Sequence, residues 1–102
     1  MTVSEALDYL LSTDETCAQA RALMNGLEKT EKTVTGQEFL KAVGTVAERE
    51  ATARTSQAYQ DWTRKYQDAW ADYETQRLKR ETAILHIEVW RTQSSNKRAG
   101  NI

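Results

Sequence analysis

Few side chains in this sequence could carry covalent or metal chemistry. The chain has one cysteine, Cys17, and one histidine, His86. A nucleophilic cysteine needs an activating base and an orienting group, and a structural zinc ion needs four cysteine or histidine ligands. Two residues far apart in the sequence supply neither set, and the sequence has no glycine-rich phosphate-binding motif. We therefore expect no catalytic residue, no metal site and no bound cofactor, and interpret the protein as a non-enzyme.

Aromatic side chains recur at helical spacing in the second half of the chain. Such a row either packs against other helices or a second copy, or stacks on the bases of a single nucleic-acid strand. The chain has only one phenylalanine, so these rings supply most of its large apolar surface, and packing is the favoured interpretation. The predicted interface residues are Tyr59, Trp62, Tyr66, Trp70, Tyr73, Ile84, Ile87 and Trp90.

Basic residues near this row could contact phosphate groups. They are Arg64, Lys65, Arg77, Lys79 and Arg80. Acidic residues are interleaved with them, and the net charge of the whole chain is −1. Because nucleic-acid-binding domains normally carry a clear basic excess, a solvated helix face is favoured, and direct DNA or RNA binding is the alternative.

Helices must position these side chains, because the chain contains no proline and only four glycines. Threonine followed three residues later by glutamate predicts helix starts at Thr2, Thr35 and Thr45. The run Ser12-Thr13-Asp14 predicts a break followed by a new helix start. Gly36 predicts a helix end, because glycine adopts the left-handed C-cap conformation at little cost.

The longest expected helix covers residues 46–92, which contain neither glycine nor proline. About 47 residues would span roughly 70 Å. Residues 82–90 alternate with the period of a strand, but a lone strand has no pairing partner, so helix is favoured. The apolar row is interrupted at Gln76 and Arg80, which leaves the continuity of the helix open at that point. The expected helices are 3–12, 14–33, 36–43 and 46–92.

We predict an all-α fold in which short N-terminal helices fold against one long C-terminal helix, as a helical hairpin or bundle. Residues 1–92 form a single domain, and residues 93–102 form a flexible tail. The short helices cannot cover the whole aromatic row, so we expect a homodimer, antiparallel through the long helices, with Trp62, Tyr66, Trp70 and Ile84 near the contact. No apolar run of about 18 residues is present, which predicts no membrane span. The single cysteine and the absence of a signal peptide favour the cytoplasm.

Two segments carry a resemblance to a class of phage proteins. Residues 87–92 with the following Ser-Ser-Asn-Lys-Arg-Ala-Gly-Asn-Ile, and residues 45–51, resemble small coil-containing helical proteins of tailed bacteriophages, encoded in early or recombination regions. The resemblance covers the C-terminal part of the chain and transfers no catalytic residue.

The resemblance implies a non-enzymatic module in the bacterial host cytoplasm. It would bind and modulate, or inhibit, a host or phage protein of nucleic-acid processing or defence. Phage inhibitors of a host nuclease and anti-CRISPR proteins are both compatible with this expectation. Direct DNA or RNA binding through the aromatic and basic face is one alternative, and a structural virion or scaffold component is the other.

Overall fold

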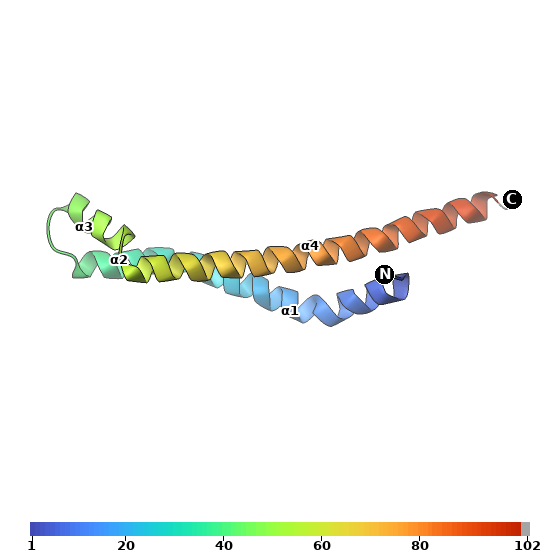
Figure 1. Cartoon of the computed structure of the whole chain (residues 1–102), viewed down its shortest axis with the longest axis horizontal. Coiled ribbons are helices and arrows are strands. Elements are labelled where there is room, and N and C mark those ends of the chain that lie inside the picture. Colours follow the sequence, from blue (N-terminus) through green and yellow to red (C-terminus); the bar gives the residue numbers. More distant parts are fainter. Residues whose placement is uncertain (101–102) are drawn as a thin grey trace. The chain divides into compact units, whose positions relative to one another are not determined.

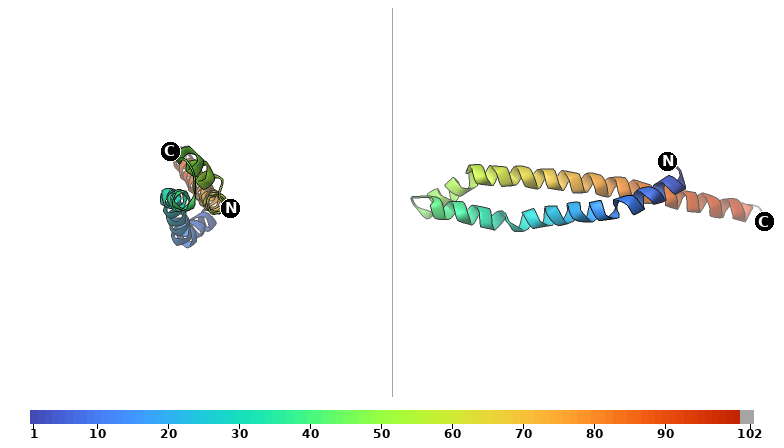
Figure 2. Two further views of the ribbon diagram at one scale, coloured as in Figure 1. Left: turned by 90° about the vertical axis from the view of Figure 1, so that its left-hand side faces the viewer. Right: turned by 90° about the horizontal axis from the view of Figure 1, so that it is seen from below.

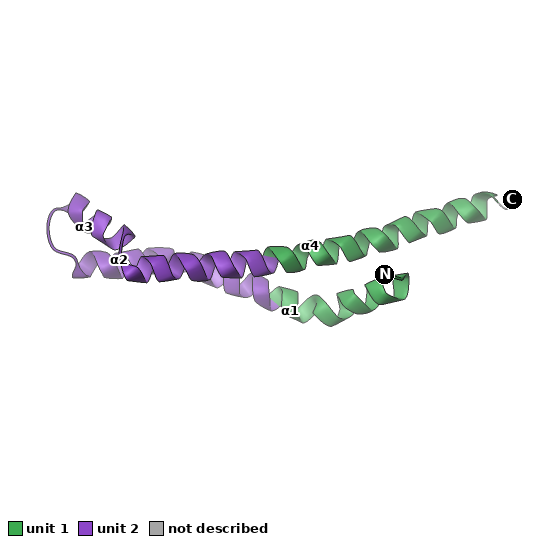
Figure 3. Ribbon diagram, in the orientation of Figure 1, with its two compact units in different colours: residues 1–18, 74–102 green, residues 19–73 purple. Residues whose placement is uncertain are grey.

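The computed structural model describes residues 1–100, and this part of the chain is folded entirely into helices and their short connections (Figure 1). The helices are α1 (Val3–Lys29), α2 (Glu31–Lys41), α3 (Val46–Arg54) and α4 (Gln57–Gly100). No strand occurs among these residues, so the predicted all-α class is confirmed. Because the chain divides into two compact units, each unit is described by itself (Figure 3).

Unit 1 combines residues 1–18 with the part of α4 that begins at Glu74. Within it, the start of α1 runs antiparallel to α4 (Figure 2). Ala6 on α1 and Ala83 on α4 are both 0% exposed. Both alanine side chains are completely covered, so the packed faces of unit 1 include a small side chain on each helix.

The packed faces of unit 1 follow a regular alternation of three- and four-residue steps. This is the heptad spacing of helices that pack along a shared seam. The buried or half-buried seam residues of α1 are Val3, Ala6, Leu10, Thr13 and Cys17, and those of α4 are Gln76, Arg80, Ala83, Ile87 and Ser94.

Unit 2, residues 19–73, contains the end of α1, all of α2 and α3, and the start of α4. Helices α2 and α3 are joined by a contact in which the Arg49 guanidinium lies 4.2 Å from the centre of the Phe39 ring. Arg49 Nε also donates to the Phe39 carbonyl at 3.3 Å. Between the two helices, Gly44 has a φ of 123°, which favours glycine. A β carbon there would also collide with the Glu48 carboxylate.

Two of the three predicted capping motifs are present. At the start of α1 the Glu5 amide donates to Thr2 Oγ1 at 3.1 Å, and the Thr2 amide donates to the Glu5 carboxylate at 3.3 Å. At the start of α3 the Glu48 amide donates to Thr45 Oγ1 at 3.2 Å. Each cap satisfies amides that have no partner inside the helix.

The predicted break near Thr13 is wrong, because α1 runs without interruption from Val3 to Lys29. The hydroxyls of Ser12 and Thr13 donate to the Tyr9 carbonyl at 3.1 and 2.7 Å, so they bond back within the helix instead of capping a new one. Thr13 also occupies a seam position, so the packing of α1 continues through it.

The predicted helix start at Thr35 and end at Gly36 are also wrong, since both residues lie inside α2. Thr35 Oγ1 is within 3.2 Å of the Glu31 carbonyl, to which it donates. The hydroxyl is therefore satisfied within the helix, and α2 continues to Lys41.

The long helix expected at 46–92 is instead two helices, α3 and α4, separated at Thr55 and Ser56. Ser56 Oγ accepts a hydrogen bond from the Tyr59 amide at 3.2 Å, which caps the new helix. Helix α4 is continuous through residues 76–80 and 82–90. It extends past Thr92 to Gly100, so residues 93–100 of the expected tail are helical; Asn101 and Ile102 lie outside the described residues.

Candidate interaction surface

The start of the aromatic row packs inside unit 2. The Trp62 ring stacks on Tyr59, with centroids 5.6 Å apart, and on Tyr66, with centroids 5.3 Å apart and planes 6° from parallel. Trp62 Nε1 donates to the Leu27 carbonyl at 2.8 Å and lies 3.2 Å from Thr30 Oγ1. These contacts anchor α4 to the end of α1.

The rest of the row divides between packed and open positions. Tyr73 in unit 2 and Ile87 in unit 1 are half-buried. Trp70 in unit 2, and Ile84 and Trp90 in unit 1, have about half of their surface exposed. Of the predicted interface residues, these three therefore present the most apolar surface to a partner.

The predicted phosphate-binding residues do not share one role. Arg80, only 21% exposed, belongs to the seam of unit 1. It donates to the Leu10 carbonyl at 2.9 Å and to Thr13 Oγ1 at 2.6 Å, and it forms an ion pair with Asp14. The Arg80 guanidinium thus binds α4 to α1 and is not available to a phosphate group.

The other basic residues lie on the surface. Arg77 forms ion pairs with Glu74 at 2.8 Å and with Glu81 at 3.5 Å. Arg64 and Lys65 in unit 2, and Lys79 in unit 1, are exposed. In unit 1, acidic side chains neutralise two of the three predicted phosphate contacts.

Sequence reasoning missed an exposed apolar line on the outer side of α4 in unit 1. Leu78, Leu85 and Val89 lie there, with 51–56% of their surface exposed. Their spacing of seven and four residues places them on one side of the helix, opposite the seam. This spacing was visible in the sequence, but it marks an outer face only once the packed face is known.

A second exposed apolar group lies at the connection between α2 and α3 in unit 2. Leu40 is at the end of α2, Val43 is in the connection and Val46 opens α3. All three are largely exposed, Val43 by 91%. The three residues flank the turn at Gly44.

The chemistry-bearing side chains are not brought together. Cys17 is a half-buried free thiol in the seam of α1, and His86 is an exposed residue of α4. Within residues 1–100, no cluster of three or more histidine, cysteine or acidic side chains could hold a metal ion. Hydrogen bonds from the side chain and backbone of Thr2 lower the pKa of the Glu5 carboxyl, which is a helix cap.

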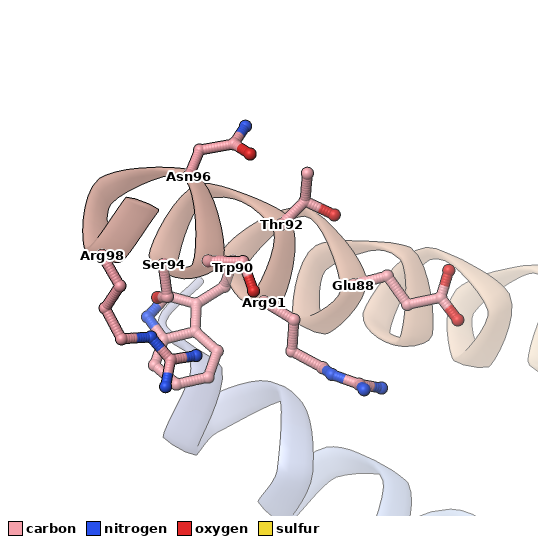
Figure 4. A pocket seen from close by; sticks show the side chains of 8 residues that line it. Glu88, Trp90, Arg91, Thr92, Ser94, Asn96 and Arg98 are labelled. Atoms are coloured by element: carbon pink, nitrogen blue, oxygen red, sulfur yellow. The ribbon is translucent and has the colours of Figure 1, made fainter. Parts of the chain in front are cut away.

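A surface hollow lies in each of the two units. The hollow in unit 1 is lined by α4 alone, where Trp90, Ser94 and Arg98 lie on one side of the helix (Figure 4). The hollow in unit 2 lies among α2, α3 and the start of α4 and is lined by residues that include Phe39 and Tyr59. Neither contains the chain's cysteine or histidine.

None of the helices in the described part of the chain combines the length and hydropathy needed to cross a lipid bilayer. Comparisons of the chain with protein-family models, with curated proteins and with solved structures give no match.

Proposed function

We propose that this chain is a non-enzymatic protein-interaction module. The observation that carries the proposal is the distribution of its apolar side chains. Among the described residues, those that are buried are all alanines: Ala6, Ala20, Ala53, Ala69 and Ala83. Larger apolar side chains such as Leu40, Val43 and Trp70 remain open to solvent. Apolar surface grouped in this way is typical of a protein that completes its packing against a partner.

The surface best suited to a foreign protein is the α2–α3 connection. Leu40 near the end of α2, Val43 in the connection and Val46 at the start of α3 are all largely exposed, and the positive φ of Gly44 defines the turn between the two helices. The partner proposed for this surface is a host or phage protein of nucleic-acid processing or defence, such as a nuclease, which the module would inhibit. This choice of partner rests on the resemblance of residues 45–51 and 87–92 to phage coil-containing proteins.

Direct nucleic-acid binding is the competing proposal. It draws support from the exposed Arg64, Lys65 and Lys79, but the pairing of Arg77 and Arg80 with acids weighs against it. The two proposals differ in their salt dependence, because contacts with phosphate weaken steeply as salt rises and apolar contacts do not. A structural virion or scaffold component would instead assemble beyond a small oligomer.

The test is affinity capture from a bacterial lysate with the tagged full-length chain, with and without added nuclease. We expect one protein to be retained stoichiometrically after nuclease treatment and moderate salt. Val43→Lys should abolish its retention, because a charge then occupies the centre of the apolar group. Leu85→Lys, at an exposed position of the other unit, is the matched control and should retain it.

Recovery of nucleic acid, or loss of every partner after nuclease treatment, would support direct binding instead. Large assemblies of the purified chain in light scattering would support the structural alternative. Retention that is equal for Val43→Lys and the unaltered chain would refute the α2–α3 connection as the binding surface.

A further inference from the structure

Helix α4 carries a second seam on the side opposite its packed face. We call it the outer seam, and it lies wholly in unit 1. Its residues alternate in three- and four-residue steps, and all of them are exposed: Thr75, Leu78, Thr82, Leu85, Val89, Thr92 and Asn96. Figure 4 shows Thr92 and Asn96 pointing away from the side of the helix that carries Trp90 and Ser94.

The outer seam contains no charged residue, although 28% of the chain is charged. The face of a helix that points away from the core is normally its most charged face. Upstream on the same line of α4, beyond the uncharged Ala71, the exposed Asp68 and Arg64 and the half-buried Asp61 are charged. The change from charged to uncharged positions on one line indicates that the outer seam is covered by another protein surface.

The residues of the outer seam match the pattern of a two-stranded coiled coil. In heptad notation the a positions are the β-branched Thr75, Thr82 and Val89, and the d positions include Leu78 and Leu85. Isoleucine or valine at a with leucine at d favours two parallel strands, and threonine shares the β-branched shape of these residues. The next a position is Asn96, and a single asparagine at an a position fixes register and favours a dimer.

The polar side chains that flank the outer seam favour a second copy of the chain as the other strand. The g positions carry Glu74, Glu81 and Glu88, and the e positions include Lys79 and His86. In a parallel pair of identical helices, each g residue faces the e residue five positions later in the other strand. Glu74 then faces Lys79, a pair of opposite charge, and Glu81 faces His86, whose ring N–H can donate to the carboxylate. An antiparallel pair would set glutamate against glutamate.

We propose that a second copy of this chain covers the outer seam and forms a parallel, in-register coiled coil over residues 75–96. This dimer differs from the antiparallel one expected from the aromatic row, because it uses the opposite face of α4 and leaves the seam with α1 intact. The Arg77 ion pairs with Glu74 and Glu81 are compatible with it, since each carboxylate accepts more than one donor. The inference does not depend on the proposed function.

The association state of the purified full-length chain is the first test. Sedimentation should give a dimer, and Leu85→Lys should raise its dissociation constant by about a hundredfold or more, because each copy loses a buried leucine. Val43→Lys is the matched control and should leave the dimer unchanged. Circular dichroism should show equal helix content in all three proteins, since both substituted residues are exposed.

Cysteine cross-linking tests the orientation of the strands. In a Cys17→Ser background, Thr75→Cys and Asn96→Cys place thiols at the two ends of the outer seam, about 32 Å apart along the helix. A parallel, in-register dimer cross-links each variant to itself under mild oxidation. It does not cross-link one variant to the other when a tagged Thr75→Cys protein is mixed with untagged Asn96→Cys protein.

Exchange of the flanking charges tests register. Lys79→Glu should weaken the dimer, because the glutamate at position 79 of each strand then faces Glu74 of the other strand. Adding Glu74→Lys to the same chain should restore it.

Three results would overturn the proposal. A chain that stays monomeric at about 100 μM would show that a second copy does not cover the outer seam, which then binds a helix of another protein or no helix. Cross-linking only in the mixture of the two variants would show an antiparallel dimer. A dimer that survives Leu85→Lys would show that another surface holds it together.

Discussion

Replacement of Trp62 or Trp70 by alanine tests the packing of unit 2 most directly. The two tryptophans lie on the same helix, eight residues apart, but only Trp62 packs inside the unit. Trp62→Ala removes one hydrogen bond, about 1 kcal/mol, and two ring contacts of about 0.5–1.5 kcal/mol each. With the lost burial, the free energy of unfolding should fall by about 3–4 kcal/mol. Trp70 is 51% exposed, so Trp70→Ala should lower it by about 1 kcal/mol.

The assay is guanidinium chloride unfolding of the full-length chain, followed by far-ultraviolet circular dichroism at equal protein concentrations. Trp62→Phe separates the two contributions, because phenylalanine keeps a stacking ring and loses the indole N–H. We expect it to cost about 1 kcal/mol. The Leu27 carbonyl stays satisfied in that variant, since the Thr30 amide also donates to it at 3.1 Å.

Equal losses for the two alanine variants would refute this reasoning. The sequence, which places both tryptophans on one aromatic row, predicts a loss of about 3–5 kcal/mol for each. A larger loss for Trp70→Ala would show that the open side of the row, and not the side facing α1, holds unit 2 together.

Three further changes test single contacts. Arg80→Met removes the hydrogen bonds to α1 and should destabilise the chain by about 2 kcal/mol. The control Arg91→Met, at an exposed site of the same helix, should change stability by less than about 0.5 kcal/mol. Similar losses for the two variants in thermal unfolding would contradict the inward position of Arg80. Gly44→Ala should lower the Tm, because a φ of 123° is unfavourable for alanine, and an unchanged Tm would show that the turn adapts. The lowered pKa of Glu5 means that its cap stabilises α1 above the pKa of the unfolded chain and is lost as the pH falls through the folded-state pKa. Thr2→Ala should raise that pKa in an NMR titration, and no change would show that the cap does not form in solution.

Much of the helical framework follows from local sequence. The caps at Thr2 and Thr45 combine an oxygen acceptor with a glutamate three residues later, so both partners lie within one helical turn. A lone strand would have no pairing partner, which left helix as the state for residues 82–90 against their strand-like alternation. The three- and four-residue spacing of the outer seam is also present in the sequence, but the sequence does not show that these positions are exposed.

Other features depend on contacts between residues far apart in the chain. Hydroxyl side chains such as those of Thr13 and Thr35 either cap a helix or bond back within one, and local sequence does not distinguish the two. At Thr13 the partner is Arg80 on α4, which no sequence spacing connects to it. The break at Thr55 and Ser56, which is capped locally by the Ser56 hydroxyl, was not predicted because it sits in a run without glycine or proline.

The sequence by itself determined that the chain forms amphipathic helices and where two of them begin, because propensity and capping act over a few residues. Only the tertiary structure decided which face of α4 packs against α1. The aromatic row and the outer seam both have heptad spacing, and spacing alone does not say which of two faces is covered. The bond from Trp62 to the Leu27 carbonyl and the bonds from Arg80 to α1 decide it. These contacts turn one face inward and leave Leu78, Leu85 and Val89 exposed.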